Sequence, residues 1–253
     1  MASDSSNTVY VITGGNRGLG LGLVKALLAR PATTVIATVR SEEASAVLKN
    51  ETVNAAKGDG SILHSVLLDF TTAVAPEQVR QVVTAVGVTK VDVLINNAGG
   101  AQPMVTALTT TADDLRSAFE TNTIAPLLVF QGLWPLLQKS SSPKLFMMSS
   151  SVGSISEMEP VPGGAYGPSR CAQNWLTRAI HLENKDSGLI AVALHPGWVQ
   201  TRAGQFVADE WGFSKGPPDT LESSIEGMLK VIDGATKETS GTFTTSKGQT
   251  LGW

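Results

Sequence analysis

The sequence has little cysteine, no long apolar run and no excess of positive charge. Its single cysteine, Cys171, excludes an internal disulfide framework. No apolar stretch approaches the roughly 20 residues that a membrane-spanning helix needs. Lys and Arg number 19 against 22 Asp and Glu, so the formal net charge of −3 provides no basic surface for nucleic acid. The polar start, residues 1–8, does not read as a signal peptide. We therefore expect a soluble, cytoplasmic protein with no membrane or nucleic-acid partner and no metal site.

Hydrophobic residues make up 42% of the chain, which is enough to fill a sizeable core. Short apolar runs typical of strands alternate with longer segments of helical periodicity. The expected strands are 9–12, 33–39, 61–68, 91–95, 143–149, 189–195 and 241–245, and the expected helices are 21–28, 41–57, 76–86, 111–138, 163–185 and 218–232. This alternation predicts a single-domain α/β Rossmann fold over residues 1–253, a doubly wound parallel sheet of about seven strands with helices on both faces. Residues 1–7 are expected to be disordered or loosely packed.

A glycine-rich turn, T-G-G-N-R-G-L-G from Thr13 to Gly20, joins the first expected strand to the first expected helix. This context is that of a dinucleotide-binding motif. Glycine lets the backbone turn tightly beside a pyrophosphate, and the helix start directs free N–H groups at it. A plain strand-to-helix connection without a ligand is the alternative interpretation. The residues predicted to bind the cofactor here are Gly14, Asn16, Arg17, Gly18, Leu19 and Gly20.

Arg40 follows the second expected strand, where a Rossmann-type unit meets the adenosine ribose. An acidic residue there would bind the 2′-hydroxyl, whereas an arginine can pair with a 2′-phosphate. Arg17, in the glycine turn, is a second cation expected near the same place. The pair predicts NADP(H) rather than NAD(H), and the alternative is that both arginines are ordinary solvated surface residues.

Asp69 after the third expected strand and N-N-A-G after the fourth complete a pattern that resembles the classical short-chain dehydrogenases/reductases. The resemblance implies that the Asp69 side chain faces the adenine. It also implies that P-G-W-V-Q-T holds the nicotinamide, with the Val199 backbone and the Thr201 hydroxyl on the carboxamide. The further cofactor contacts implied by the family are Asn97, Ala98, Gly99, Pro196 and Gly197.

The same resemblance assigns the catalytic residues. Tyr166 is the expected donor of a hydrogen bond and then a proton to the developing alkoxide. Ser150 precedes Gly153 by the family spacing and is expected to share the carbonyl oxygen. Asn122 lies with Pro126 inside an expected helix, where both residues are unfavourable, so we predict a local break. The family's asparagine at this place holds a water that relays protons, and a kink without chemistry is the alternative.

Arg170 departs from the family pattern Y-x-x-x-K, because this chain reads Y-G-P-S-R. Residues i and i+4 share a helix face, so the guanidinium is expected beside Tyr166, where it favours the ionised phenol and can bind the cofactor ribose. Arginine does not release its proton, so the family's relay through lysine is not expected here unchanged. Three functions stay open: a ketoreductase slowed by proton delivery, a non-redox isomerase, cyclase or dehydratase that uses NADP(H) as a scaffold, and an NADP(H)-binding protein with little turnover.

One branch of the family shares more of the chain. The stretches L-E-N-K, H-P-G-W-V-Q-T and I-D-G-A-T-K-E-T-S-G-T-F and the terminal Trp253 resemble fungal norsolorinic acid ketoreductase-like proteins. The resemblance implies an NADPH-dependent ketoreductase of fungal secondary metabolism acting on an aromatic or polycyclic ketone. It also implies a homodimer or homotetramer.

Residues 202–218 are polar and glycine-bearing, with aromatic side chains between, and suit a lid over a flat apolar substrate. Packing of these aromatic side chains on the sheet is the alternative. The residues predicted to contact the substrate are Ser150, Met158, Tyr166, Phe206 and Trp211.

Overall fold

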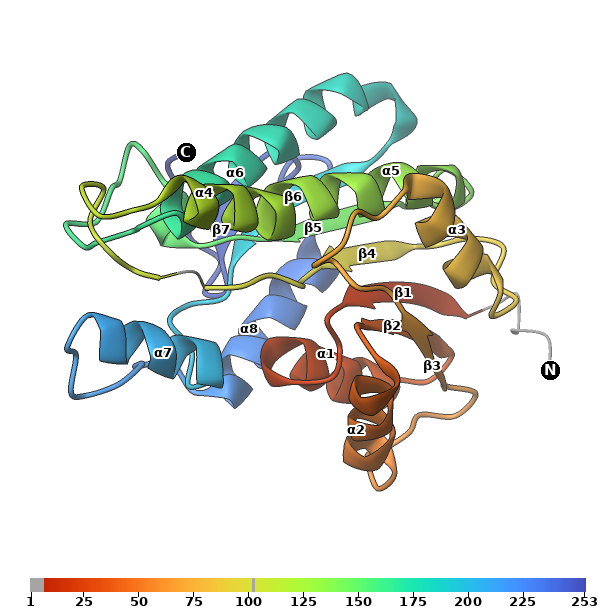
Figure 1. The fold of residues 1–253 in the computed structure, drawn as a ribbon. Coiled ribbons are helices and arrows are strands. Elements are labelled where there is room, and N and C mark those ends of the chain that lie inside the picture. Colours follow the sequence, from red (N-terminus) through yellow and green to blue (C-terminus); the bar gives the residue numbers. More distant parts are fainter. Residues whose placement is uncertain (1–6, 102) are drawn as a thin grey trace.

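Eight strands form one sheet in the part of the chain described by the computed structural model, residues 7–101 and 103–253. Their order is β3-β2-β1-β4-β5-β6-β7-β8, and every neighbouring pair is parallel except β7 and β8 (Figure 1). The bounds are β1 Thr8–Thr13, β2 Thr33–Val39, β3 Ile62–Leu67, β4 Val93–Asn96, β5 Lys144–Met148, β6 Ile190–His195, β7 Phe243–Thr245 and β8 Thr250–Leu251. The order reverses between β1 and β4, as in doubly wound nucleotide-binding folds.

Helices cover both faces of this sheet (Figure 1). Their bounds are α1 Gly18–Leu28, α2 Glu42–Thr52, α3 Pro76–Thr84, α4 Ala112–Phe119, α5 Ala125–Leu137, α6 Tyr166–Glu183, α7 Arg202–Glu210 and α8 Leu221–Gly234. Within the described residues, no helix combines the length and the apolar character that crossing a lipid bilayer requires.

The core has two halves, one on each face of the sheet. Side chains alternate along a strand, so Val9 and Val11 of β1 pack on one face and Tyr10 and Ile12 on the other. The first half is completed by residues of α3, α5 and α6, and the second by residues of α1, α2 and α8. Because both faces are covered, the central strands are apolar almost throughout, which is why they are recognisable in the sequence.

The long helix expected over 111–138 is present but changes character in the middle. Thr111 caps α4 and forms a capping box with Asp114. A π-helical turn over Glu120–Ile124 contains Asn122 and separates α4 from α5. Pro126 then occupies the first turn of α5, where a missing N–H is tolerated. The predicted local disruption is confirmed, and it takes the form of a π-turn.

The structure differs from the sequence-based expectation in several places. The helix expected over 41–57 ends at Thr52, the helix expected from residue 163 begins at Tyr166, and α7 lies within the expected lid. The two-residue strand β8 adds an antiparallel edge to the sheet and was not predicted, because so short a segment carries no periodic signal. Asn7 was expected in a loosely packed start, but it is 2% exposed, and its amide donates to Thr34 Oγ1 and the Gly60 carbonyl. The rest of that expectation, for residues 1–6, lies outside the described residues.

Candidate active site

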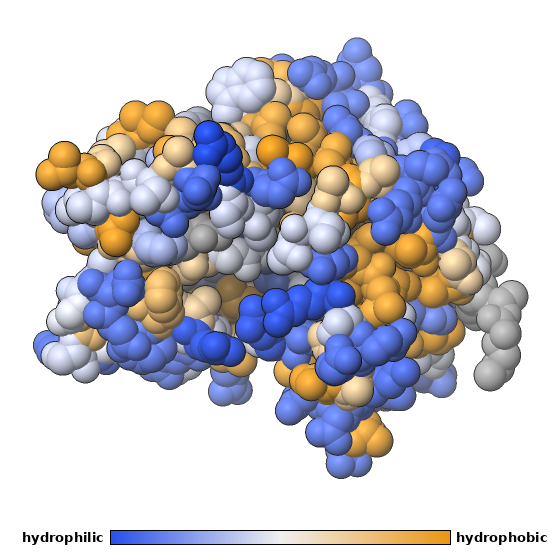
Figure 2. Space-filling view, in the orientation of Figure 1, coloured by the Kyte–Doolittle hydropathy of each residue, from blue (hydrophilic) through white to orange (hydrophobic). Residues whose placement is uncertain are grey.

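The predicted site residues gather at one edge of the sheet. The carboxyl ends of parallel strands meet at the same edge, so the segments after β1, β2, β4, β5 and β6 lie close together. In space-filling view, this side of the molecule is hollowed between α7 and the ends of α4 and α6 (Figure 2). The edge therefore provides a concave surface bordered by segments distant in sequence.

The glycine turn after β1 has the close approaches that a pyrophosphate site needs. Gly14 and Gly18 have φ values of +70° and +52°, which other residues rarely adopt. A Cβ on Gly20 would lie 2.2 Å from the Gly14 carbonyl oxygen, so no other residue fits there. Arg17 is the N-cap of α1, and no side chain among the described residues caps this helix. The first N–H groups of α1 are thus left facing the edge, and this arrangement fits a bound phosphate.

The N-N-A-G loop after β4 is joined directly to the glycine turn. The Asn97 amide donates to the carbonyls of Thr13 and Gly14 at 2.8 and 3.3 Å. The Ala98 N–H donates to Thr13 Oγ1 at 2.8 Å. The Asn97 side chain therefore holds the β1 turn in place, and the exposed backbone of Gly99 is left to border the site.

Arg17 and Arg40 are both exposed, and neither guanidinium forms a hydrogen bond or salt bridge with another described residue. Both are thus available to an anionic ligand at the ends of β1 and β2. Asp69, after β3, accepts hydrogen bonds from the N–H and the hydroxyl of Thr71 at 2.9 and 2.8 Å. These bonds, with a smaller contribution from Arg40, lower the pKa of Asp69. The carboxylate is therefore ionised at neutral pH, and Arg40 is close enough to affect it.

Three serines follow β5, and their contacts differ. Ser149 is buried and donates to Asn174 Oδ1 at 2.6 Å, so its hydroxyl serves the protein interior. Ser150 accepts a hydrogen bond from the Val152 N–H at 3.3 Å, and no described residue accepts its proton. The hydroxyl of Ser150 remains free to donate. These contacts are compatible with the choice of Ser150, which the spacing to Gly153 favours and which stays a prediction.

Tyr166 is the first residue of α6, and Pro168 follows within the first turn, where it breaks no hydrogen bond. No described residue forms a hydrogen bond with the Tyr166 hydroxyl. The short helical turn Ser151–Gly153 packs on this end of α6, and a Cβ on Gly153 would lie 2.7 Å from the Arg170 Cβ. This close packing brings the segment that carries Ser150 against the helix that carries Tyr166.

Arg170 is 5% exposed and reaches under the site into the protein. Its Nη1 donates to the Met148 carbonyl at 2.7 Å and to Gln173 Oε1 at 2.9 Å. Its Nε is buried and has no partner among the described residues. A Cβ on Gly99 would lie 2.4 Å from Nη2, so the guanidinium packs directly against the backbone of this glycine. Gln173 was not identified from the sequence, although an i, i+3 pair on a helix is the signal that reveals it.

Asn122 is fully buried, and its side chain is bonded to two neighbours. Its amide donates to the Gly100 carbonyl and to Ser169 Oγ, both at 3.1 Å, and its Oδ1 accepts the Gly100 N–H at 3.0 Å. Both amide protons are used, so the side chain positions the loop after β4 against α6. A water molecule that relays protons at Asn122 would therefore have to form its hydrogen bond with the second lone pair of Oδ1 or with the backbone.

The segment predicted as a lid contains the helix α7 and packs through its aromatic side chains. The Trp198 ring lies 5.5 Å from that of Trp211 and 5.0 Å from that of Phe213. Trp211 Nε1 also donates to the Pro162 carbonyl at 3.0 Å, which joins the two walls of the hollow. The other predicted substrate contacts, Met158 and Phe206, are 70% and 37% exposed. The aromatic residues thus pack on the loop after β6 rather than on the sheet, and Phe206 projects from α7.

A separate cavity of about 660 Å³ lies between α8 and the β7–β8 hairpin. Glu226, Lys230, Thr242 and Lys247 are among the residues that line it, and none of the predicted cofactor or substrate residues does. The proposed chemistry is therefore assigned to the edge described above and not to this cavity.

The sheet order and the glycine turn at the start of α1 are those of a nucleotide-binding α/β fold. The sequence profile described as short chain dehydrogenase matches residues 8–211, and the chain belongs to this family. It is 38% identical over 260 aligned residues to the short-chain dehydrogenase RED3 of Pyricularia oryzae, with 98% of this chain and 100% of the relative covered.

Two further relatives are informative about chemistry. Norsolorinic acid ketoreductase nor1 of Dothistroma septosporum is 35% identical over 258 residues, covering 99% of this chain and 94% of the relative. An NADPH-bound carbonyl reductase from chicken fatty liver superimposes with a TM-score of 0.80 at 31% identity, covering 98% of this chain and 99% of that chain. These relatives share the whole extent of the described fold with this chain.

Proposed function

We propose that the protein is an NADPH-dependent ketoreductase that reduces a ketone on an aromatic or polycyclic secondary metabolite, with Tyr166 as the proton donor. The observation that carries the proposal is the position of Tyr166. Its hydroxyl, at the start of α6, has no hydrogen-bond partner among the described residues. The Ser150 segment contacts the same helix, and the Arg170 guanidinium lies against the Tyr166 ring. A phenol with a nearby cation is a suitable general acid for a developing alkoxide.

The cofactor-binding part of the proposal uses the cradle at the end of β1. The glycine turn and the start of α1 would hold the pyrophosphate, and Arg17 and Arg40 would pair with the 2′-phosphate. The loop after β6, with Val199 and Thr201, would hold the carboxamide. When bound, NADPH supplies a hydride to the carbonyl carbon.

The chain's own residues would handle the oxygen. Ser150 would donate a hydrogen bond to the carbonyl oxygen, and Tyr166 would donate a second bond and then its proton as the alkoxide forms. The positive charge of Arg170 would stabilise the resulting phenolate. Because arginine keeps its proton, Tyr166 would be reprotonated from solvent water that enters the hollow.

An aromatic substrate is supported by the cluster of Trp198, Trp211 and Phe213 beside the site. Flat aromatic rings bind well against such side chains. The name of the nor1 relative, a norsolorinic acid ketoreductase, supports the same class. A homodimer or homotetramer and a cytoplasmic location complete the proposal, on the basis of the family resemblance and the single cysteine.

The test exchanges Tyr166 for phenylalanine, which removes only the hydroxyl. With a panel of aromatic ketones, turnover is expected to fall by about 10²- to 10⁴-fold, the usual contribution of a positioned general acid. NADPH affinity, measured by fluorescence titration, should stay within about twofold, because the exchange removes no charge that faces the phosphates. Tyr10→Phe in β1 is the matched control, since Tyr10 is in the core, and it should leave turnover unchanged.

The same assay distinguishes the alternatives. NADPH binding without oxidation by any ketone would favour a binding protein. Conversion of a substrate with no net change in NADPH would favour a non-redox enzyme. An unchanged rate in Tyr166→Phe would remove Tyr166 from the role of proton donor.

A further inference from the structure

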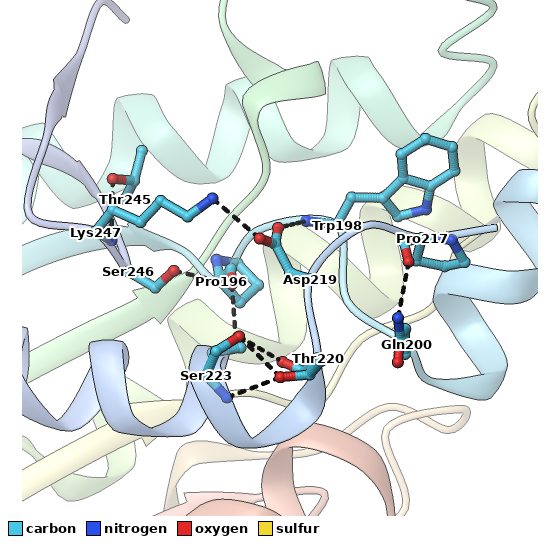
Figure 3. A network of polar contacts seen from close by, with 11 residues as sticks. Pro196, Trp198, Gln200, Pro217, Asp219, Thr220, Ser223, Thr245, Ser246 and Lys247 are labelled. Carbon is cyan, nitrogen blue, oxygen red and sulfur yellow. Dashed lines mark hydrogen bonds and ion pairs between the residues drawn. The ribbon is translucent and has the colours of Figure 1, made fainter. Parts of the chain in front are cut away.

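Asp219 lies in the loop before α8 and forms hydrogen bonds with the loop after β6 (Figure 3). Its Oδ2 accepts the Trp198 N–H at 3.0 Å, and its own N–H donates to the Trp198 carbonyl at 3.0 Å. Its carbonyl accepts the Gln200 N–H at 2.8 Å. A parallel bridge between Val199 and Asp219 results from this backbone pairing. One residue thus holds the middle of P-G-W-V-Q-T through both its backbone and its side chain.

Gly197 shows how closely the carboxylate is seated. Its φ is +95°, and a Cβ at this position would lie 2.4 Å from Asp219 Oδ2. The loop therefore needs glycine here both for its backbone conformation and for the approach of Asp219. The side chain of Asp219 is only 19% exposed, so its bonds are largely protected from water.

The opposite oxygen of Asp219 is tied to the β7–β8 hairpin. Lys247 Nζ donates to Oδ1 at 3.0 Å. The neighbouring Ser246 hydroxyl donates to the Pro196 carbonyl at 3.0 Å (Figure 3). Ser224 of α8 donates to the same carbonyl at 2.7 Å. The loop after β6 is therefore held both by the start of α8 and by the β7–β8 hairpin. The Asp219 carboxylate bonds to the loop through one oxygen and to Lys247 of the hairpin through the other.

Asp219 also marks the end of the lid segment 202–218. The segment leaves the sheet edge directly after Thr201 and returns at Asp219, so the Val199–Asp219 bridge holds its two ends together. The Trp198 side chain continues this link, because its Nε1 donates to the Gly204 carbonyl at 3.0 Å and its ring packs on Trp211. The base of the lid and the loop after β6 are thus one connected unit.

We infer that Asp219 is a positioning residue that fixes the nicotinamide-binding loop and ties it to the base of the lid. The inference rests on the proposed function, because the contact between this loop and nicotinamide belongs to that proposal. With the loop held rigidly, the backbone of Val199 and the hydroxyl of Thr201 present one arrangement of bonding groups to the carboxamide. The nicotinamide then offers one face to the substrate.

The test compares Asp219→Ala and the isosteric Asp219→Asn with the parent protein. Binding is measured with NADPH and with 2′,5′-ADP, which carries the adenosine 2′-phosphate but no nicotinamide. Loss of a charged hydrogen-bond acceptor is expected to weaken NADPH binding about tenfold in Asp219→Ala, whereas 2′,5′-ADP binding should stay within about twofold. Asp219→Asn keeps an acceptor for the Trp198 N–H, so its NADPH affinity should lie between those of the parent protein and Asp219→Ala.

A second measurement reports orientation directly. An aromatic ketone that the parent protein reduces is incubated with NADPH deuterated on one or the other face of the nicotinamide. The deuterium content of the product alcohol is then measured. The parent protein should transfer from one face, and Asp219→Ala should lose part of this selectivity. Asp233→Asn is the matched control, since Asp233 forms a half-exposed ion pair with Arg30 away from the loop, and it should change neither measurement.

The outcomes separate the inference from the proposed function. Unchanged NADPH affinity and unchanged face selectivity in Asp219→Ala would overturn the positioning role. Equal weakening of NADPH and 2′,5′-ADP would also overturn it, since the effect would then be general. A parent protein that binds NADPH and reduces no ketone would instead contradict the proposed function. The comparison of NADPH and 2′,5′-ADP binding would still test whether Asp219 positions the loop.

Discussion

The guanidinium carbon of Arg170 lies 5.1 Å from the centre of the Tyr166 ring. The two residues are one turn apart on the same face of α6. Met148 and Gln173 hold the guanidinium through Nη1, so its position is set by β5 and α6 together. The guanidinium thus packs on the face of the Tyr166 ring, and its bonds to buried groups hold it in place.

Arg170→Lys tests whether proton delivery limits turnover. A lysine ammonium can exchange its proton, so we expect turnover with a simple ketone to rise, and the solvent deuterium isotope effect on kcat to become smaller. Lysine cannot satisfy both the Met148 carbonyl and Gln173 in the same way, so unfolding free energy should fall by about 1–3 kcal/mol. The measurements are steady-state kinetics in H₂O and D₂O and urea unfolding.

Arg178→Lys is the matched control for this prediction. Arg178 lies on the same helix and donates to the Gly241 carbonyl at 2.7 Å, away from Tyr166. It should alter stability without a gain in turnover. A slower Arg170→Lys enzyme, assayed where it is fully folded, would show that the site requires the guanidinium and would strengthen the non-redox alternative.

Arg40→Ala tests the cofactor preference. Arg40 is exposed at the end of β2, and it forms no ion pair among the described residues, so its removal should leave the fold intact. Loss of one charge-assisted contact to a 2′-phosphate is expected to weaken NADPH binding about 10- to 100-fold, with NADH binding nearly unchanged. Isothermal titration with both cofactors measures the difference. Equal weakening of both would contradict the assignment, and Arg116→Ala on the surface of α4 serves as the control.

His195 should make the protein less stable in mild acid. Burial lowers the pKa of His195 from 6.5 to about 4, and its Nδ1 accepts the Ser151 N–H at 3.3 Å. Between these two pKa values the unfolded chain binds a proton that the folded chain does not, so stability falls as the pH drops below about 6.5. At pH 5 the expected loss relative to pH 7.5 is about 2 kcal/mol from this residue.

His195→Asn isolates that contribution, because asparagine can keep an acceptor for the Ser151 N–H and does not titrate. The free energy of unfolding, measured in urea at pH 7.5 and pH 5, should decrease less in the variant than in the parent protein. Burial also lowers the pKa of His64 and His181, and both remain in the variant, so they cancel in the comparison. An equal decrease in both proteins would show that His195 is not the group responsible.

Several elements were predictable because their signals are local. The strand Thr33–Val39 was expected with its observed bounds, since a strand buried on both faces is a continuous apolar run. The glycine turn and α1 follow from the backbone demands of Gly14 and Gly18. The disruption at Asn122 follows from two residues that are unfavourable inside a helix.

The contacts that complete the site have no such local signal. The bond between Asp219 and Trp198 joins residues 21 apart in the chain, and the bond between Arg170 and Met148 joins residues 22 apart. Nothing in the amino-acid pattern indicates that the loop before α8 returns to the loop after β6. The same applies to the direction of the Arg170 side chain, which depends on the space beside Gly99.

By itself the amino-acid sequence determined the fold class, the family and the positions of the glycine turn, Tyr166 and Arg170. The fold class follows from apolar periodicity and the glycine turn from backbone constraints, both of which act over a few residues, whereas the family and the place of Tyr166 follow from the resemblance of the motifs. Only the tertiary structure decided that Arg170 is held by Met148 and Gln173 and that Asp219 holds the loop after β6. Such contacts arise when segments distant in sequence are packed together, and burial then requires each polar group to find whichever partner lies nearby.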